Sequence, residues 1–161
     1  MMKDFLLVAG LLTVPATVSV HQYQAQRAVD QSDPRLCQLR EFFAQRSCPL
    51  RDSAEDFLVA ADQNNLDWRL LPSISMVESS GGKDYRNNNV LGWDSCREKF
   101  SSVQAGIHYV AAQLARSKTY RNKNLDEKLQ TYNPHPEYPG RIKAVMRSLA
   151  ATQLPGMISA N

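Results

Sequence analysis

Helical spacing of apolar residues dominates this chain from residue 35 to residue 149. Apolar side chains recur three and four positions apart, and no segment there shows a sustained strand-like alternation. Leu36, Leu39 and Phe43 share one helical face near the start, as Ile142 and Leu149 do near the end. A chain of 161 residues is long enough for one domain with one sizeable core. The sequence therefore predicts a single all-α or mostly α domain of about six helices.

Capping residues indicate where several of these helices begin and end. Ser53 and Asp56 resemble a capping pair before an apolar run, and the Asn-Asn pair at 64–65 ends that run. Ser101 and Gln104 predict a capping box at the start of a later helix. Just before that helix, the segment KDYRNNNVLGWDSCREKF lacks helical spacing and predicts a loop or a short hairpin.

One helix ends in the sequence SMVESSGG. Asp67 is placed to cap it, and Pro72 in its early part predicts either a kink or a later start. The Gly-Gly pair at 81–82 predicts its end. Glu78 therefore lies at the C-terminal end of a helix, where the partial negative charge of the backbone disfavours an anionic side chain.

The carboxyl group of Glu78 is predicted to hold its proton. Leu71 and Ile74 lie on the same helical face as Glu78, so the carboxyl leaves from the apolar side. Partial burial and the helix end both raise the pKa of such a group. A carboxyl that stays protonated near neutral pH is a suitable general acid. The alternative is an exposed glutamate at an ordinary helix end.

The N-terminus predicts export. Residues 1–20 have one lysine, an apolar stretch and then small residues, which is the layout of a signal peptide. An uncleaved anchor in the inner membrane and a buried N-terminal element are the alternatives. Residues 21–34 are polar and predict a linker, residues 35–155 form the domain, and residues 156–161 are a tail. The localisation expected is periplasmic, cell-envelope or secreted.

The charge pattern and the histidines exclude other classes of function. The net charge is only +3 and the basic residues are spread along the chain, so no nucleic-acid partner is expected. The three histidines are far apart and lack neighbours at metal-ligand spacing, so we predict neither a metal nor a cofactor.

Three cysteines allow one disulfide in an exported chain. If Cys37 and Cys48 lie near opposite ends of one helix, they are roughly 15 Å apart at about 1.5 Å per residue. A disulfide needs Cα atoms within roughly 7 Å, which excludes that pair. Cys48–Cys96 is therefore the hypothesis for any bridge formed.

The order of four motifs resembles a known superfamily. The sequence has ESSGG, then NNNVLGW, then a capped helix, then YNP, over about residues 54–149. This order is similar to the lysozyme-like superfamily of peptidoglycan-cleaving enzymes, and most similar to its endo-β-N-acetylglucosaminidase group. It also resembles soluble lytic transglycosylases. GWDSCREKF stands where those transglycosylases usually have Gly-Leu-Met-Gln, which favours the first group.

The resemblance implies a lysozyme-like catalytic domain in which Glu78 is the catalytic acid. The positions that match the family's substrate-binding residues are Ser79, Asn89, Trp93, Tyr132 and Asn133. The hydroxyl of the matching tyrosine approaches the acid in the family. Core packing is the alternative for the tryptophan and for this tyrosine.

A second carboxylate remains open at this point. Many glycosidases use two carboxylates, and Asp84, Asp94, Glu98 and Asp126 are the candidates. A substrate-assisted route, with the N-acetyl group of the sugar as nucleophile, needs no second acid.

The function expected is that of an exported enzyme that cuts peptidoglycan glycan strands at a β-1,4 bond between amino sugars. A lytic transglycosylase and a catalytically weak wall-binding or assembly protein are the alternatives.

Overall fold

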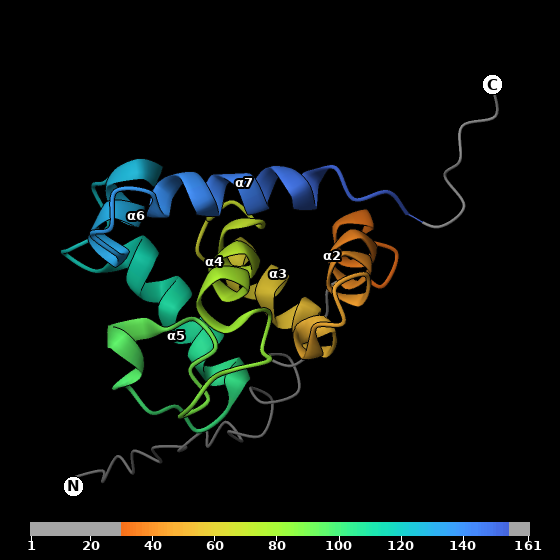
Figure 1. Cartoon of the computed structure of the whole chain (residues 1–161), viewed down its shortest axis with the longest axis horizontal. Helices are drawn as coiled ribbons and strands as arrows, with labels where there is room; N and C mark the ends of the chain where they lie inside the picture. Colours follow the sequence, from red (N-terminus) through yellow and green to blue (C-terminus); the bar gives the residue numbers. More distant parts are fainter. Residues whose placement is uncertain (1–29, 155–161) are drawn as a thin grey trace, which may run out of the picture.

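The computed structural model describes residues 30–154 (Figure 1). This part of the chain contains six α-helices, two short 3₁₀-helices and no β-strand. The α-helices are α2 (Pro34–Ala44), α3 (Ala54–Gln63), α4 (Leu70–Ser79), α5 (Val103–Arg116), α6 (Leu125–Tyr132) and α7 (Tyr138–Ala150), and the 3₁₀-helices are η2 (Pro49–Ser53) and η3 (Trp93–Cys96). The predicted all-α fold is confirmed, and the segment after α4 is a loop rather than a hairpin.

The predicted signal peptide or anchor, most of the linker and the tail lie outside the described residues. The first described helix begins at Pro34, where the Asp33 side chain accepts the backbone N–H of Arg35 and caps α2. Within residues 30–154, no helix combines the length and the apolar character that a membrane span requires.

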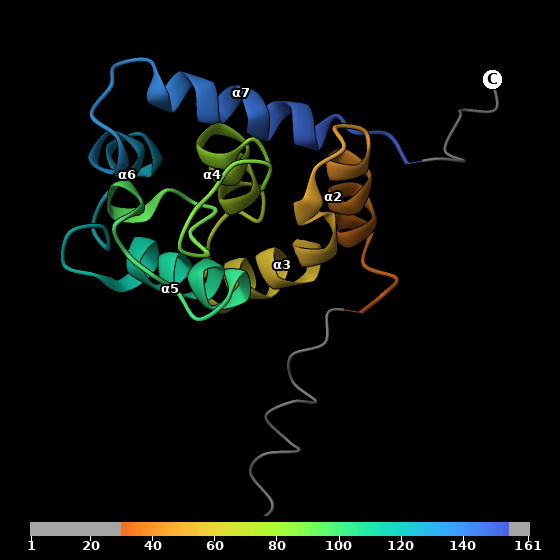
Figure 2. The same cartoon turned by 60° about the horizontal axis from the view of Figure 1, so that its bottom comes forward.

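Helix α4 lies at the centre of the domain. It packs against α7 on one side and α3 on another, and α3 packs against α5. In Figures 1 and 2, α7 runs along one side of the molecule, with α6 at one of its ends and α2 at the other. A helix with neighbours on several sides needs apolar residues around most of its circumference. The first six residues of α4 are accordingly all buried.

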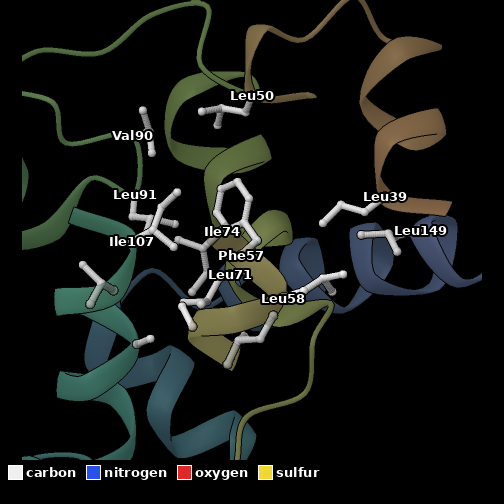
Figure 3. Close-up of a cluster of buried hydrophobic side chains, with 14 of the residues drawn as sticks. Leu39, Leu50, Phe57, Leu58, Leu71, Ile74, Val90, Leu91, Ile107 and Leu149 are labelled. Carbon is white, nitrogen blue, oxygen red and sulfur yellow. The ribbon is translucent and has the colours of Figure 1, made fainter. Parts of the chain in front are cut away.

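The core gathers side chains from every α-helix. Figure 3 shows Phe57, Leu71 and Ile74 at its centre, where α3 and α4 meet. Val90 and Leu91 reach the same cluster from the loop after α4, and both are fully buried. This loop is therefore held by its own apolar residues, although it has no regular secondary structure.

Both ends of α4 follow from local side-chain chemistry. The Asp67 carboxylate accepts the backbone N–H of Arg69 at 2.9 Å, and the helix begins at Leu70. Pro72 thus falls in the first turn, where its missing N–H breaks no intrahelical hydrogen bond. The sequence predicts either a kink or a later start of this helix, and the later start is correct. At the other end, residues 80–82 all have positive φ and turn the chain sharply away.

Three predicted caps differ from the structure. The sequence predicts that Asp67 caps α4, but the N-cap residue of α4 is Arg69, which has no side-chain capping hydrogen bond. Ser53 is the N-cap residue of α3, but its side chain makes no capping hydrogen bond. Helix α5 is capped by Ser102, not Ser101, because the Ser102 hydroxyl accepts the N–H of Ala105. The capping box predicted for Ser101 and Gln104 is therefore wrong. The Gln104 amide donates instead to the Asp56 carboxylate on α3.

Helices α2 and α7 bring the two ends of the domain together. The Gln38 side chain on α2 donates to the carbonyl oxygens of Ala150 at 2.9 Å and Thr152 at 3.1 Å. The Arg46 guanidinium donates to the Ser148 hydroxyl at 2.9 Å. These hydrogen bonds link residues more than 100 positions apart.

Candidate active site

A groove of about 550 Å³ opens beside the C-terminal end of α4. Four segments line it: the end of α4, the loop with η3, the loop after α5, and the end of α6 with the residues that follow. The lining residues are Glu78, Gly92, Trp93, Asp94, Ser95, Thr119, Tyr120, Thr131, Tyr132, Asn133 and Pro134. The fold thus brings together four of the six residues that the sequence predicts for the site, namely Glu78, Trp93, Tyr132 and Asn133.

Glu78 supplies the carboxyl group of this groove. It is the penultimate residue of α4, and its side chain is half-buried. Burial raises the pKa of the Glu78 carboxyl above its ordinary value, and this effect outweighs those of the Tyr138 hydroxyl and the Arg141 guanidinium, which lower the pKa. The predicted direction of the shift is confirmed, with burial as its main cause.

Gly92 lets the loop backbone approach the Glu78 carboxyl closely. A Cβ atom at this position would lie 2.5 Å from Oε2 of Glu78 and 3.0 Å from its Cδ atom. Gly92 also has a φ of +70°, in the left-handed region that favours glycine. The glycine is thus required both for the local turn and for the space that the carboxyl occupies.

Trp93 is the centre of an aromatic cluster. Its ring lies 5.6 Å from that of Tyr132, 5.8 Å from that of Tyr120 and 6.2 Å from that of Tyr109, measured between centroids. It is half-buried and lines the groove as well. Part of the Trp93 side chain therefore packs against other aromatic residues, as expected of a core residue, and another part lines the groove.

Two tyrosines lie next to Glu78. The Tyr132 hydroxyl donates to the backbone carbonyl of Leu91, which ties α6 to the loop before Gly92. Burial and the charge of Glu78 raise the pKa of Tyr132 well above its ordinary value. The Tyr138 ring stacks on the Tyr132 ring, with 6.1 Å between centroids and 6° between planes. Tyr138 is fully buried, and burial together with the charge of Glu78 raises the pKa of its hydroxyl.

Ser79 and Asn89, which the sequence predicts to bind substrate, do not line the groove and are buried. Ser79 is 2% exposed; its hydroxyl donates to the carbonyl of Ser75 at 2.9 Å and accepts the N–H of Gly82 at 3.1 Å. Its hydrogen bonds stabilise the turn that ends α4.

Asn89 has the corresponding role in the loop. It is 1% exposed, its amide donates to the carbonyls of Trp93 at 2.8 Å and Glu98 at 3.3 Å, and its Oδ1 accepts the N–H of Trp93 at 2.9 Å. The side chain replaces the backbone partners that an irregular loop lacks. Asn89 therefore positions Trp93 and has no free group for a ligand.

Asn133 lines the groove at the end of α6, where its side chain accepts the backbone N–H of His135 at 3.0 Å. Of the candidates for a second carboxylate, only Asp94 lines the groove, and it is ion-paired with Arg97. Asp126 forms an ion pair with Lys143, and Asp84 and Glu98 are exposed outside the lining.

The predicted Cys48–Cys96 disulfide is absent, because the three cysteines are free in the structure. Helix α2 ends at Ala44, and Cys48 follows it in a buried site, where its sulfur lies 3.7 Å from that of Met76. Burial raises the pKa of the Cys48 thiol. Cys96 belongs to η3, on the groove side of the molecule near Tyr132.

Sequence reasoning missed several residues of this site: Gly92, Tyr120, Thr131, Tyr138 and Arg141. The Gly-Trp pair at 92–93 carried a signal for a tight turn, but the others are separated from Glu78 by long stretches of sequence. Among residues 30–154, no three His, Cys, Asp or Glu side chains are grouped so that they could hold a metal ion.

Comparison with known proteins gives no match: no family model fits the chain, and no curated protein or solved structure is significantly similar to it. The chemistry of the groove must therefore be argued from its own geometry. It presents one half-buried carboxyl with a raised pKa, beside aromatic rings, neutral polar groups and the ion-paired Asp94. A carboxyl of this kind is chemically able to donate a proton to an oxygen of a ligand that packs on the aromatic side chains.

Proposed function

We propose that this protein cleaves glycan strands of peptidoglycan, with Glu78 as the general acid. The observation that carries the proposal is the Glu78 carboxyl itself. It is half-buried, its pKa is raised, and it faces a groove large enough for sugar rings. The order of motifs that resembles the lysozyme-like superfamily supports the same function, and the apolar N-terminal segment supports export to the compartment that holds this substrate.

The groove supplies the contacts that a sugar strand requires. The Trp93 ring presents an apolar face, Thr119 offers a hydroxyl group and Asn133 an amide group. In the proposed reaction, the Glu78 carboxyl gives its proton to the glycosidic oxygen as the bond from that oxygen to the anomeric carbon breaks. The leaving sugar departs as an alcohol, and Glu78 is left as a carboxylate.

The second half of the reaction does not require a second protein acid. Asp94 is the only other carboxylate on the groove lining, and its pairing with Arg97 restricts it. This favours a substrate-assisted route, in which the N-acetyl oxygen of the sugar attacks the anomeric carbon. Subsequent attack by water gives hydrolysis of the glucosaminidase type. Attack by a hydroxyl of the same sugar gives the anhydro end of a lytic transglycosylase, which is the second candidate.

The test is the loss of turbidity of a peptidoglycan suspension, measured for the parent protein and for Glu78→Gln. Glutamine keeps the shape of the side chain but has no acidic proton, so activity should fall by at least about 10²-fold. Mass spectrometry of the released ends separates hydrolysis from transglycosylation. A folded Glu78→Gln protein that clears the suspension at the parent rate contradicts the proposal and favours a wall-binding protein.

The same variant has an expected effect on stability. Because the folded protein raises the pKa of Glu78, the parent loses stability as the pH rises from the unfolded pKa, about 4.3, through the folded pKa. Glu78→Gln does not lose stability in this way, because the glutamine side chain does not ionise. Its melting temperature at pH 7 should therefore equal or exceed that of the parent, and this measurement separates lost catalysis from lost folding.

A further inference from the structure

Tyr109, in the middle of α5, is an exposed aromatic residue beside the groove. Within residues 30–154 the large apolar side chains that are exposed are Tyr85, at 44%, and Tyr109, at 41%. Exposure alone does not indicate a function, because single apolar residues are common on protein surfaces. The two tyrosines differ in their surroundings, and this difference points to a function for Tyr109.

Two other aromatic rings hold the ring of Tyr109 in place. Measured between centroids, it lies 5.4 Å from the ring of Phe100 and 6.2 Å from the ring of Trp93, with interplanar angles of 49° and 80°. Such separations and tilts are those of favourable aromatic pairs. Tyr85, in contrast, takes part in none of the ring contacts within residues 30–154. Tyr109 is therefore a fixed aromatic surface, whereas Tyr85 is an ordinary exposed side chain.

Gly106 makes room for this arrangement. A Cβ atom at this position would lie 2.8 Å from Cδ2 of Phe100 and 3.1 Å from the carbonyl oxygen of Asn88. Glycine thus lets the Phe100 ring pack against α5 one helical turn before Tyr109, on the same side of the helix. In Figures 1 and 2, the loop that carries η3 lies beside α5. Helix and loop together build the support under the Tyr109 ring.

Trp93 connects this surface to the groove. Trp93 lines the groove and also contacts Tyr109, which is itself outside the lining. Tyr109 therefore lies just beyond the rim, next to the aromatic residue that forms part of the groove wall. A ring whose only task is to support Trp93 would be expected in the core, but two fifths of Tyr109 is open to solvent.

The helix surface around Tyr109 is uncharged. Its neighbours three and four positions away on α5 include Ala105, Ala112 and Gln113, which are small or neutral. Arg116, two turns further on, donates to the carbonyl oxygen of Gln63 on α3 at 3.0 Å. An aromatic ring among neutral side chains suits the apolar face of a sugar ring and offers nothing specific to an ion.

We propose that Tyr109 is a sugar-binding residue outside the groove, on which a glycan strand that passes over Trp93 places one further sugar ring. The proposal rests on the function proposed above. A peptidoglycan strand is a polymer, so sugars on either side of those in the groove must cross its rim. The rings of Trp93 and Tyr109 are close enough to contact neighbouring sugars of one strand. The site thereby favours long strands over short fragments.

The first test measures binding in the Glu78→Gln background, so that the sugar is not cut. Strand binding is followed by cosedimentation with insoluble peptidoglycan. Groove binding is followed with the disaccharide of N-acetylglucosamine and N-acetylmuramic acid, through the NMR signal of the Trp93 indole N–H. Tyr109→Ala should weaken cosedimentation by roughly 3- to 10-fold, the value of one aromatic contact, and leave the affinity for the disaccharide unchanged.

Two variants serve as controls for this measurement. Tyr109→Phe keeps the ring and should bind peptidoglycan like the Glu78→Gln protein, because stacking on a sugar needs the ring and not the hydroxyl. Tyr85→Ala removes a tyrosine of matched exposure and should also bind like that protein. The proposal is overturned if Tyr109→Ala binds peptidoglycan undiminished, if Tyr109→Phe is as weak as Tyr109→Ala, or if Tyr85→Ala is equally weak. An equal loss for peptidoglycan and disaccharide also overturns it, because Tyr109 then only supports Trp93.

The second test uses cleavage by variants that retain Glu78. With soluble glycan strands freed of their peptides, Tyr109→Ala should raise KM by roughly 3- to 10-fold and change kcat much less, because a sugar bound outside the groove contributes equally before and during the reaction. A loss confined to kcat contradicts the proposal.

Failure of this proposal can be told apart from failure of the proposed function. If Glu78→Gln cleaves like the parent, the role of Glu78 is wrong, and the binding measurements still decide the role of Tyr109. If the parent cleaves peptidoglycan and Tyr109→Ala binds it undiminished, only the role of Tyr109 is wrong. If the parent neither binds nor cleaves peptidoglycan, both proposals are wrong.

Discussion

Gly92 gives the sharpest test of the site geometry, through the substitution Gly92→Ala. The new Cβ atom would lie 2.5 Å from Oε2 of Glu78, about 0.9 Å short of an ordinary contact at 3.4 Å. The backbone at φ +70° is unfavourable for alanine as well. The substitution therefore forces either the carboxyl or the loop to move.

Both costs have known sizes. A non-glycine residue in the left-handed region costs about 1–2 kcal/mol, and an overpacked contact costs about 1–3 kcal/mol. A loss of about 2–5 kcal/mol is therefore expected. For a domain of this size it lowers the melting temperature by roughly 8–20 °C. Displacement of the carboxyl by nearly 1 Å should reduce cleavage by about 10²-fold, because catalysis depends on the placement of the acid.

Gly140→Ala is the matched control. Gly140 lies in the first turn of α7, and a Cβ atom there would have no neighbour within 4 Å. Alanine is favoured over glycine in a helix by up to about 1 kcal/mol, so this variant should be as stable as the parent or slightly more stable. Thermal melts followed by circular dichroism and the turbidity assay, carried out well below the melting temperature, measure both effects.

A double variant separates the two contributions. In Glu78→Ala, the side chain that Gly92→Ala would contact is gone, so adding Gly92→Ala should cost only the backbone part, about 1–2 kcal/mol. The reasoning is refuted if Gly92→Ala melts within a degree of the parent and cleaves at the parent rate. It is also refuted if the cost of Gly92→Ala is the same with and without the Glu78 side chain.

Two further predictions concern the loop. Asn89→Ala removes three hydrogen bonds to the backbone of residues 93 and 98 and leaves their buried groups unpaired, so the free energy of unfolding should fall by about 2–4 kcal/mol, measured by urea denaturation. A variant as stable as the parent contradicts the structural role of Asn89. Trp93→Ala should weaken binding to insoluble peptidoglycan and slow its cleavage, while the helical circular-dichroism signal persists, because the ring is only half-buried. Global unfolding of Trp93→Ala contradicts its place in the groove.

The helices were predictable because their signals are local. Apolar spacing of three and four residues located all six, and the same pattern placed Glu78 on the apolar face near the end of α4. The raised pKa of Glu78 followed from that placement alone. Helix starts were less predictable, because Ser101 and Ser102 are both suitable N-cap residues in sequence. Which of them caps α5 depends on how α5 packs against α3.

The rest of the site was not predictable because it depends on contacts between distant segments. Ser79 and Asn89 stand within recognisable motifs, but a motif does not show whether a polar side chain faces a ligand or its own backbone. Here the loop needs both of them for its hydrogen bonds. Tyr138 carries no local signal at all, and its relation to Glu78 arises only when α7 packs on α4.

The hydrogen bonds between α2 and α7 have a consequence for the order of the chain. They hold the first and last described helices side by side, at the end of α7 that lies away from α6 (Figure 1). Gln38 and Thr152, near the two ends of the described chain, are therefore in direct contact, so the ends can be joined by a linker and the chain reopened in the exposed segment 84–86, which does not line the groove. Such a circular permutant should keep the groove intact, because the geometry of the groove depends on which helices touch and not on which of them comes first.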